Sequence, residues 1–309
     1  MEEEEKKGGW KLVLSLIFIS IVTISLFIYW FVPFNTINFG IGNSNYNFSL
    51  VSNSSMQFYD NLRFPKSEIS YLIYNCPLDK KNEMEQAFEI LGNKTVLEFY
   101  SVGSKEEISI TCESKNKFAE GLFIAGEGGP TNITKTTNFN VIANGKILLI
   151  RDSKCEIPNV ALHELLHVLG FRHSSNPKNI MYNMSKCGQT IGDDVTNLID
   201  DLYSYESLPD LALRNVTAII EGKYLNTNLT LANDGLIVSQ NSKINIYADF
   251  KLVKELEIGP MEVGYGKIMM LSNIWINQLS VDELRFELVY SYPELSKENN
   301  QIVLNTVLD

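Results

Sequence analysis

The pattern of apolar and polar positions divides this chain of 309 residues into three regions. An uncharged apolar run at residues 12–34 is long enough to cross the hydrocarbon core of a bilayer. Residues 64–207 mix short apolar runs with helical periodicity, which is typical of an α+β domain. From residue 208 to 309 the chain changes to short alternating segments separated by turn residues. We therefore expect one membrane-spanning helix, then an α+β domain, then an all-β domain.

The apolar run at 12–34 is interpreted as an uncleaved signal anchor. A cleaved signal peptide would have a shorter apolar core and a small-residue cleavage site, and neither is evident. Lysines precede the run, but neither Lys nor Arg follows it until Arg63. The positive-inside rule then makes residues 1–11 a cytoplasmic tail of a single-pass cell-membrane protein and places the rest of the chain outside. Residues 35–63, rich in Asn and Ser, are predicted to form a stalk.

Within the central region, period-two and period-3.6 patterns predict strands that alternate with helices. The predicted strands cover residues 69–74, 96–102, 108–112, 139–143 and 146–150. The predicted helices cover residues 80–91 and 160–169. The last helix carries the chemistry described next.

All three histidines of the chain fall within residues 163–173. His163 and His167 are four positions apart, so they project from the same face of a helix. Gly170 adopts a positive φ at low cost, so it can end that helix and turn the chain to bring in His173. Three imidazoles with a fourth position left for water are the ligand set of a catalytic zinc. The segment therefore predicts a zinc site.

Glu164 follows the first of these histidines and can reach a metal-bound water without being a ligand. Zinc lowers the pKa of bound water from about 15.7 to roughly 7, which makes hydrolysis feasible at neutral pH. The predicted chemistry is amide hydrolysis by a zinc-activated water with Glu164 as general base. The alternative is an amphipathic core helix that happens to carry two exposed histidines. The glycine and third histidine in register argue against that alternative.

These residues resemble the metzincin metalloproteases, whose HExxHxxGxxH motif is matched at all five fixed positions. Ser174 and the Asn-Ile-Met-Tyr sequence at 179–182 resemble the matrixins within that group, and the resemblance places Met181 in a Met-turn beneath the zinc. Residues 193–203 resemble the matrixin closing helix. The resemblance covers about residues 64–206. It implies an α+β fold with a twisted, mostly parallel sheet, an active-site helix, a Met-turn and a closing helix.

Several of these residues have a second interpretation. A methionine in an apolar run is usually a core residue, although the spacing of Met181 from His173 favours the Met-turn. Tyr182 either donates a hydrogen bond to a transition-state oxyanion or lines the wall of the site. Asp193 and Asp194 either cap the closing helix or anchor the Met-turn.

The chain also departs from the family. Matrixins commonly hold a second, structural zinc with histidines, and no further histidine exists here, so we expect one catalytic zinc only. A propeptide cysteine that caps the zinc is not recognisable; Cys76 is better explained by a disulfide or a buried thiol. Calcium could bind around residues 126–131 and Asp152, but no acidic cluster with loop spacing supports it.

Four cysteines, Cys76, Cys112, Cys155 and Cys187, all follow the apolar run. An even number on the outer side of a membrane predicts two disulfides. Of the three connectivities, we favour Cys76 with Cys112 and Cys155 with Cys187. The sequence leaves the choice open, and four buried thiols are the alternative.

About seven alternating segments after residue 208 predict an immunoglobulin-like β-sandwich. The order Pro209-Asp210-Leu211, Asn233-Asp234-Gly235 and Glu298-Asn299-Asn300 resembles CARDB-type domains of cell-surface proteins. Such a domain would bind a surface partner or brace its neighbour. The formal net charge of −11 argues against nucleic acid as a partner, because phosphate binding needs a basic surface.

Together these features predict a membrane-anchored, extracytoplasmic zinc endopeptidase that acts on proteins or peptides. The competing hypothesis is a cell-surface adhesion or scaffold protein with a degenerate or latent protease domain. An intact Glu164 favours the enzyme. Catalytic turnover, rather than zinc content, separates the two.

Overall fold

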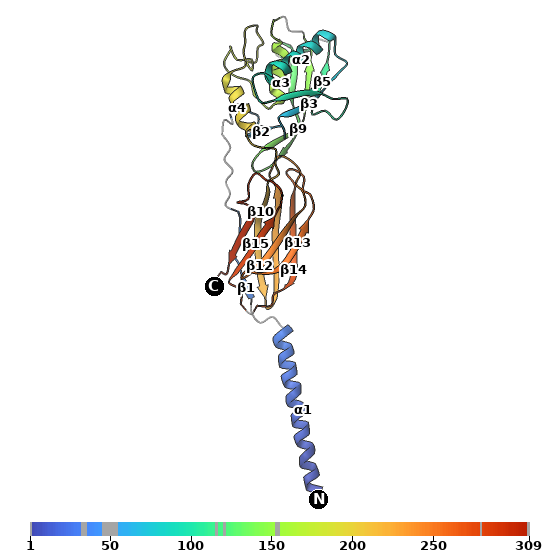
Figure 1. The fold of residues 1–309 in the computed structure, drawn as a ribbon, viewed down its shortest axis with the longest axis vertical. Coiled ribbons are helices and arrows are strands. Elements are labelled where there is room, and N and C mark those ends of the chain that lie inside the picture. Colours follow the sequence, from blue (N-terminus) through green and yellow to red (C-terminus); the bar gives the residue numbers. More distant parts are fainter. Residues whose placement is uncertain are drawn as a thin grey trace.

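The computed structural model describes residues 2–31, 36–44, 55–114, 117–119, 122–151, 155–278 and 280–307. Three bodies follow one another along its long axis: a single helix, a β-sandwich, and a mixed domain of helices and strands (Figure 1). The mixed domain and the helix lie at opposite ends, and the sandwich lies between them. The fold class predicted from the sequence is confirmed.

Helix α1 (Glu2–Phe31) contains the apolar run. Its segment Trp10–Trp30 has 21 residues and a mean hydropathy of 2.6, and none of it is buried against the rest of the chain. At 1.5 Å per residue it is about 31 Å long, which matches the hydrocarbon core of a bilayer. Membrane anchors and signal sequences share this length and composition.

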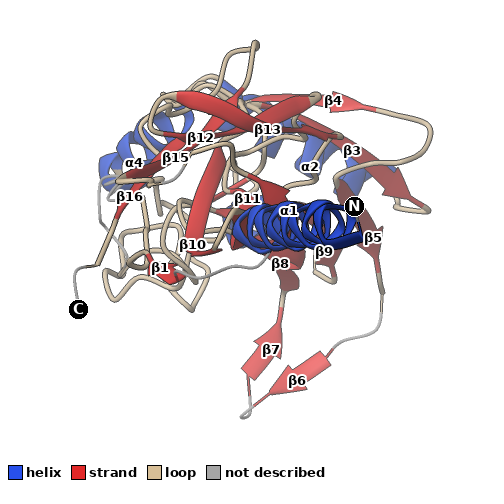
Figure 2. Ribbon diagram, turned by 90° about the horizontal axis from the view of Figure 1, so that it is seen from below, coloured by secondary structure: helices blue, strands red, loops and turns tan. Residues whose placement is uncertain are grey.

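The mixed domain is built on a twisted sheet with strand order β2-β9-β5-β3-β4. All neighbours in this order are parallel, whereas β8 pairs with β9 in the antiparallel sense and has no second partner among the described strands. The strands are β2 (Leu62–Arg63), β3 (Glu68–Tyr74), β4 (Glu98–Ser101), β5 (Ile108–Cys112), β8 (Gly126–Lys135) and β9 (Asn140–Leu149). Strand β8 is therefore a sheet edge. The short hairpin of β6 (Lys117–Ala119) and β7 (Leu122–Ile124) projects from this domain (Figure 2).

Three helices complete the domain: α2 (Leu78–Gly92), α3 (Asn159–Val168) and α4 (Asp193–Tyr203). Helix α2 buries Met84, Ala87, Phe88 and Leu91, which recur at the three- and four-residue spacing of one helix face. Helix α3 is almost entirely buried, because it lies in the centre of the domain core.

One strand differs from expectation. The sequence predicted two strands, 139–143 and 146–150, separated at Asn144-Gly145, which is a common turn dipeptide. The structure has a single strand, β9, across this point. A Cβ at Gly145 would lie 2.4 Å from Cγ1 of Val168, so the glycine lets α3 approach the sheet. Here the glycine serves close packing instead of a turn.

The sandwich consists of two four-stranded antiparallel sheets, in the orders β1-β10-β11-β14 and β13-β12-β15-β16. Its strands are β1 (Thr36–Asn38), β10 (Leu211–Glu221), β11 (Tyr224–Asn233), β12 (Ser242–Ala248), β13 (Lys251–Ile258), β14 (Gly266–Trp275), β15 (Glu283–Val289) and β16 (Gln301–Asn305). Buried and partly exposed residues alternate strictly along β12, as expected for a strand with one face in a core.

The stalk prediction for residues 35–63 is wrong at both ends. Residues 36–38 add strand β1 to the sandwich, beside β10, and Phe39 is buried in the sandwich core. At the other end, Gln57 bridges to Phe171, and β2 joins the parallel sheet. The Asn- and Ser-rich composition suggested a linker, but apolar Ile37 and Phe39 alternate with polar neighbours and so suit a half-buried strand. Residues 45–54 lie outside the described part.

A polar network joins the two folded domains. Asp210 is fully buried and accepts hydrogen bonds from Nδ2 of Asn138, at 2.5 Å, and of Asn299, at 2.9 Å. Asn138 belongs to the turn between β8 and β9, whereas Asp210 and Asn299 belong to the sandwich. Next to it, Arg214 forms an ion pair with Asp234. The sandwich therefore holds the β8–β9 turn in a fixed position.

Candidate active site

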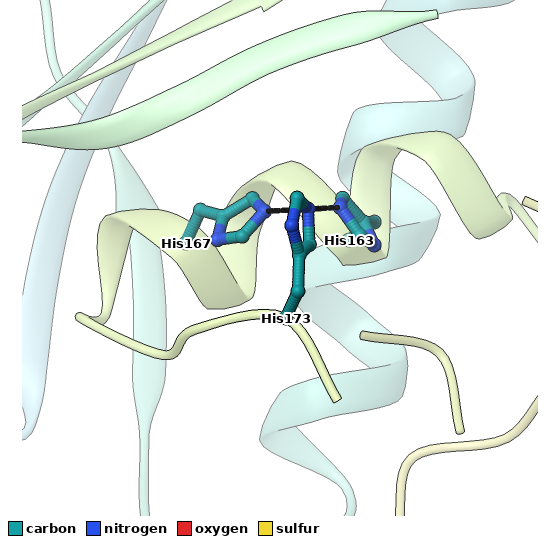
Figure 3. Close-up of side chains that lie close together, drawn as sticks. All are labelled: His163, His167 and His173. Carbon is teal, nitrogen blue, oxygen red and sulfur yellow. Dashed lines mark hydrogen bonds between the residues drawn. The ribbon is translucent and has the colours of Figure 1, made fainter. Parts of the chain in front are cut away.

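The turn after helix α3 brings the third histidine to the first two. Gly170 has φ +96°, and its amide donates to the His167 carbonyl at 2.9 Å. A Cβ at Gly170 would lie 2.4 Å from Cδ2 of Leu62, so the site has no room for a side chain. The chain reverses here, and His173 then lies beside His163 and His167 of α3 (Figure 3).

The three imidazole rings converge through their Nε2 atoms (Figure 3). These atoms are 3.0 Å apart for His163 and His167, 3.1 Å for His167 and His173, and 3.3 Å for His163 and His173. Nδ1 of His163 lies 2.8 Å from the Ile180 carbonyl, and Nδ1 of His167 lies 2.7 Å from the Phe171 carbonyl. A carbonyl only accepts, so both rings carry the proton on Nδ1 and present an Nε2 lone pair.

This arrangement fits zinc. Lone pairs that face one another repel unless a cation lies among them. Zn–N bonds of about 2.0–2.1 Å at tetrahedral angles put ligand nitrogens about 3.3 Å apart, close to the observed separations. Burial lowers the pKa of all three histidines, to about 4 for His167, and so favours the neutral form that binds metal. Within the described part of the chain, no other group of His, Cys, Asp or Glu converges in this way.

Glu164 is 6% exposed and lines the cleft together with the histidines. Burial, followed by the negative charge of Glu127, raises its pKa to about 8. A cation at the histidines acts in the opposite direction and favours the carboxylate. The environment therefore holds a carboxyl group whose proton affinity depends strongly on the metal.

Strand β8 passes directly over Glu164 because it carries two glycines there. A Cβ at Gly126 would lie 2.7 Å from Cγ of Glu164, and a Cβ at Gly128 would lie 2.3 Å from its backbone oxygen. This glycine-rich stretch is part of the calcium site considered from the sequence, and Asp152, the other part, lies outside the described residues. The alternating glycines Gly126 and Gly128 at the start of β8 were the sequence signal for close strand–helix contact.

The site opens into a cleft of about 710 Å³. Its walls come from the start of β8, from α3 and from the segment after the Met-turn. The residues that line it besides the histidines and Glu164 are Ile124, Ala125, Gly126, Glu127, Gly128, Arg151, Val160, Asn183, Met184 and Ser185. The free edge of β8 therefore borders the cleft.

Met181 is 2% exposed and borders, with His173, a second small cavity of about 200 Å³. Its carbonyl accepts the amide of Ser174 at 2.8 Å, and its own amide donates to Oδ1 of Asn179. This loop also supplies the carbonyl that orients His163. Tyr182 is half-buried and does not line the cleft, so neither role considered for its side chain is evident.

The closing helix α4 begins after Gly192, which is the N-cap and makes no side-chain cap. Asp193 and Asp194 lie in its first turn, where negative charge is favourable. A Cβ at Gly192 would meet both Asp194 and Asn179, and Asp194 lines the small cavity with Met181. Asp194 therefore faces the Met-turn.

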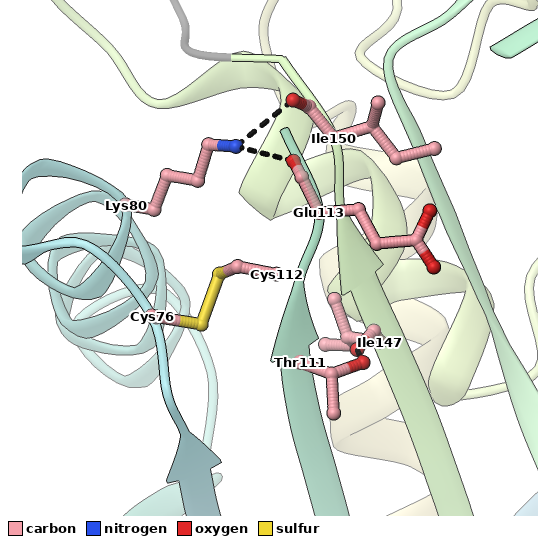
Figure 4. The surroundings of a disulfide bond; sticks show 7 residues. All are labelled: Cys76, Lys80, Thr111, Cys112, Glu113, Ile147 and Ile150. Atoms are coloured by element: carbon pink, nitrogen blue, oxygen red, sulfur yellow. Dashed lines mark hydrogen bonds between the residues drawn. A yellow bond between two sulfur atoms is a disulfide. The ribbon is translucent and has the colours of Figure 1, made fainter. Parts of the chain in front are cut away.

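Both disulfides have the connectivity favoured from the sequence, Cys76–Cys112 and Cys155–Cys187. The first joins the ends of β3 and β5, next to buried Lys80, whose Nζ donates to the carbonyls of Glu113 and Ile150 at 2.9 Å each (Figure 4). The second ties the segment before α3 to the segment after the Met-turn. It therefore fixes two walls of the cleft relative to each other.

Comparison with known proteins agrees with this geometry. Residues 63–204 match the matrixin family model. Macrophage metalloelastase of Rattus norvegicus is 28% identical over 174 residues, which are 50% of this chain and 35% of that protein. The chain thus covers about a third of that relative.

Two solved structures are similar to parts of the chain, each at 16% identity. High choriolytic enzyme 1, a hatching enzyme zinc-protease from Oryzias latipes, aligns over 51% of this chain and 99% of its own, with a TM-score of 0.29. The CARDB domain of the PF1109 protein from Pyrococcus furiosus, in complex with di-metal ions, aligns over 33% of this chain and 90% of its own, with a TM-score of 0.27. The family match and the histidine cluster fall on the same segment, so residues 63–204 of this chain are similar to the matrixins, which belong to the metzincin class of zinc metalloendopeptidases.

Proposed function

We propose that this protein is a membrane-anchored zinc endopeptidase with its catalytic domain outside the cell. The observation that carries the enzyme assignment is the convergence of three Nε2 atoms beside buried Glu164 at an open cleft. His163, His167 and His173 would hold the metal, and Met181 would support the site from below.

The chain's own groups have distinct roles in this proposal. Zinc held by His163, His167 and His173 would supply a Lewis acid for a peptide carbonyl and for water. The Ile180 and Phe171 carbonyls keep two imidazoles in the ligating tautomer. Glu164 accepts a proton from the attacking water and passes it to the leaving amine. The free edge of β8 would align an extended peptide by main-chain hydrogen bonds.

The anchor assignment rests on α1 and on the order of the domains. Lysines precede the apolar segment, so the N-terminus is expected in the cytoplasm. The two disulfides agree with an oxidising compartment on the other side. The sandwich would then separate the protease from the membrane, in the role that we predicted for a stalk.

The decisive experiment uses the full chain in detergent with a diverse peptide mixture, and identifies products by mass spectrometry. Glu164→Gln keeps the shape of the side chain and removes the base, so cleavage should be lost while bound zinc, measured by atomic emission, remains. Glu89→Gln, on α2 away from the cleft, is the matched control and should cut like the native protein. A zinc-loaded, folded native chain that cuts nothing would favour the scaffold hypothesis.

A further inference from the structure

One end of the sandwich lies next to the outer end of α1. The helix ends at Phe31 and β1 starts at Thr36, five residues later, so the connection spans at most about 18 Å. Thr36 pairs with Glu221, the last residue of β10. In addition, Nζ of Lys223 lies 3.7 Å from the centre of the Trp30 ring, at the last turns of the helix. Figure 1 shows the end of α1 beside the end of the sandwich that carries β1.

Strand register shows which loops form this end. The β10–β11 turn closes where Glu221 pairs with Tyr224. The β12–β13 turn closes where Ala248 pairs with Lys251, and the Ala248 carbonyl accepts a hydrogen bond at 3.0 Å from Nε2 of Gln278, in the segment that follows β14. Strand β14 finishes at the same level, because its last residue Trp275 pairs with Tyr224. We call these three segments, residues 221–224, 248–251 and 275–278, the anchor-facing end.

The anchor-facing end presents aromatic side chains to its surroundings. Phe250 is 76% exposed at the tip of its turn, and Trp275 is 41% exposed with its ring 5.4 Å from that of Tyr224. Phe250 has φ +68° and follows Asp249 at φ +42°. Two-residue hairpin turns of this kind favour Asn-Gly, and a bulky residue at positive φ is strained. Within the described chain, no contact buries the Phe250 side chain and offsets this strain.

The charges at this end are mixed, so attraction to anionic lipid does not explain it. Lys223 and Lys251 are accompanied by Glu221 and Asp249 in the same segments. Asp249 is engaged locally, because its carboxylate accepts the amide of Asp282 at 3.0 Å. The feature that remains is a set of aromatic rings, which prefer the membrane–water interface.

We propose that the anchor-facing end rests on the lipid surface, with Phe250 inserted among the lipids and Trp275 and Tyr224 at headgroup level. This inference depends on α1 being a membrane anchor. It would orient the sandwich upright and hold the protease at a fixed height, since an 11-residue strand such as β10 is about 35 Å long.

The test places a polarity-sensitive fluorophore on a single new cysteine in the full chain, reconstituted in phosphatidylcholine vesicles. Phe250→Cys reports the anchor-facing end. Tyr265→Cys is the matched control, because Tyr265 is 67% exposed at the opposite end of the sandwich. The four native cysteines are in disulfides and do not react without reductant.

The proposal expects lipid-borne nitroxides to quench the probe at 250 and aqueous iodide to leave it bright, with the reverse at 265. Equal quenching of both probes by iodide would overturn it. Vesicle flotation after alkaline washing tests the anchor separately: a chain that floats with a water-exposed probe at 250 refutes the surface contact alone, whereas a chain that does not float refutes the anchor.

A second measurement avoids the substitution at the tip. In a Trp10→Phe, Trp30→Phe background, Trp275 is the one tryptophan left. Brominated lipids should then quench its fluorescence in vesicles, and detergent without bromine should restore it. Unchanged fluorescence in brominated vesicles would also overturn the proposal.

Discussion

Substituting Gly170 by alanine should destabilise the active-site turn through two separable terms. The residue has φ +96°, where a side chain costs about 1–2 kcal/mol. Its Cβ would also meet Leu62, at 2.4 Å from Cδ2 and 2.9 Å from Cγ, and Leu62 is fully buried. Overpacking of this kind costs about 1–3 kcal/mol. The sum is about 2–5 kcal/mol.

Gly188 is a matched control, because it has φ +88° and no atom within 4 Å of an added Cβ. Gly188→Ala should therefore cost only the backbone term, about 1–2 kcal/mol. Leu62→Ala in the Gly170→Ala background should recover the packing term but leave the backbone term, a coupling that a double-mutant cycle measures.

Native-state hydrogen exchange read by mass spectrometry resolves the effect by region, which suits a chain of several domains. In Gly170→Ala, the opening free energy of peptides that cover α3 should be lower by about 2–5 kcal/mol. The opening free energy of peptides that cover β12 should not change. Equal values for Gly170→Ala and Gly188→Ala would refute the packing argument. Peptidase activity should fall with Gly170→Ala, because His173 follows the turn.

Three further predictions concern the domain junction, the sandwich and the metal. Asn138→Ala should lower the opening free energy of the β8–β9 turn by about 1–3 kcal/mol in the same exchange experiment, because it removes a donor to buried Asp210. Burial raises the pKa of Glu294 to about 7, so the free energy of unfolding should fall as pH rises from about 4.5 to 7. Glu294→Gln mimics the neutral form and should abolish that fall. In urea titrations at pH 8 its free energy of unfolding should be higher than that of the native protein. A zinc chelator should lower the calorimetric unfolding temperature of the protease domain and leave that of the sandwich unchanged, because the ion binds only the folded site.

The parts of the site that depend on local spacing could be predicted from the sequence. His163 and His167 share a helix face whatever surrounds them, and Gly170 limits how the chain can leave that helix. The strand edge over the site could not be predicted in the same way. Gly126 and Gly128 become informative only once β8 is known to cross α3, and that contact joins residues far apart in the chain.

The stalk shows the same limit for the fold. Composition gave no reason to pair residues 36–38 with β10, because the partner lies more than 170 residues later in the chain. Likewise, the Asn144-Gly145 dipeptide carries a turn signal that tertiary packing overrides at Val168. In both places, long-range contact decided a structure that local preference left open or predicted incorrectly.

The sandwich lies between α1 and the protease domain and contacts both of them. The chain leaves α1, contributes β1 to the sandwich, builds the protease and then returns to complete the sandwich. Because the β8–β9 turn is bound through Asn138 to Asp210, the sandwich supports the hairpin whose first strand borders the cleft. Loosening this junction should therefore reduce cleavage of long peptides, which need the edge of β8, more than cleavage of short ones. Comparing kcat/KM of Asn138→Ala on a long and a truncated substrate tests this, and an equal loss on both would show that the sandwich acts only as a spacer.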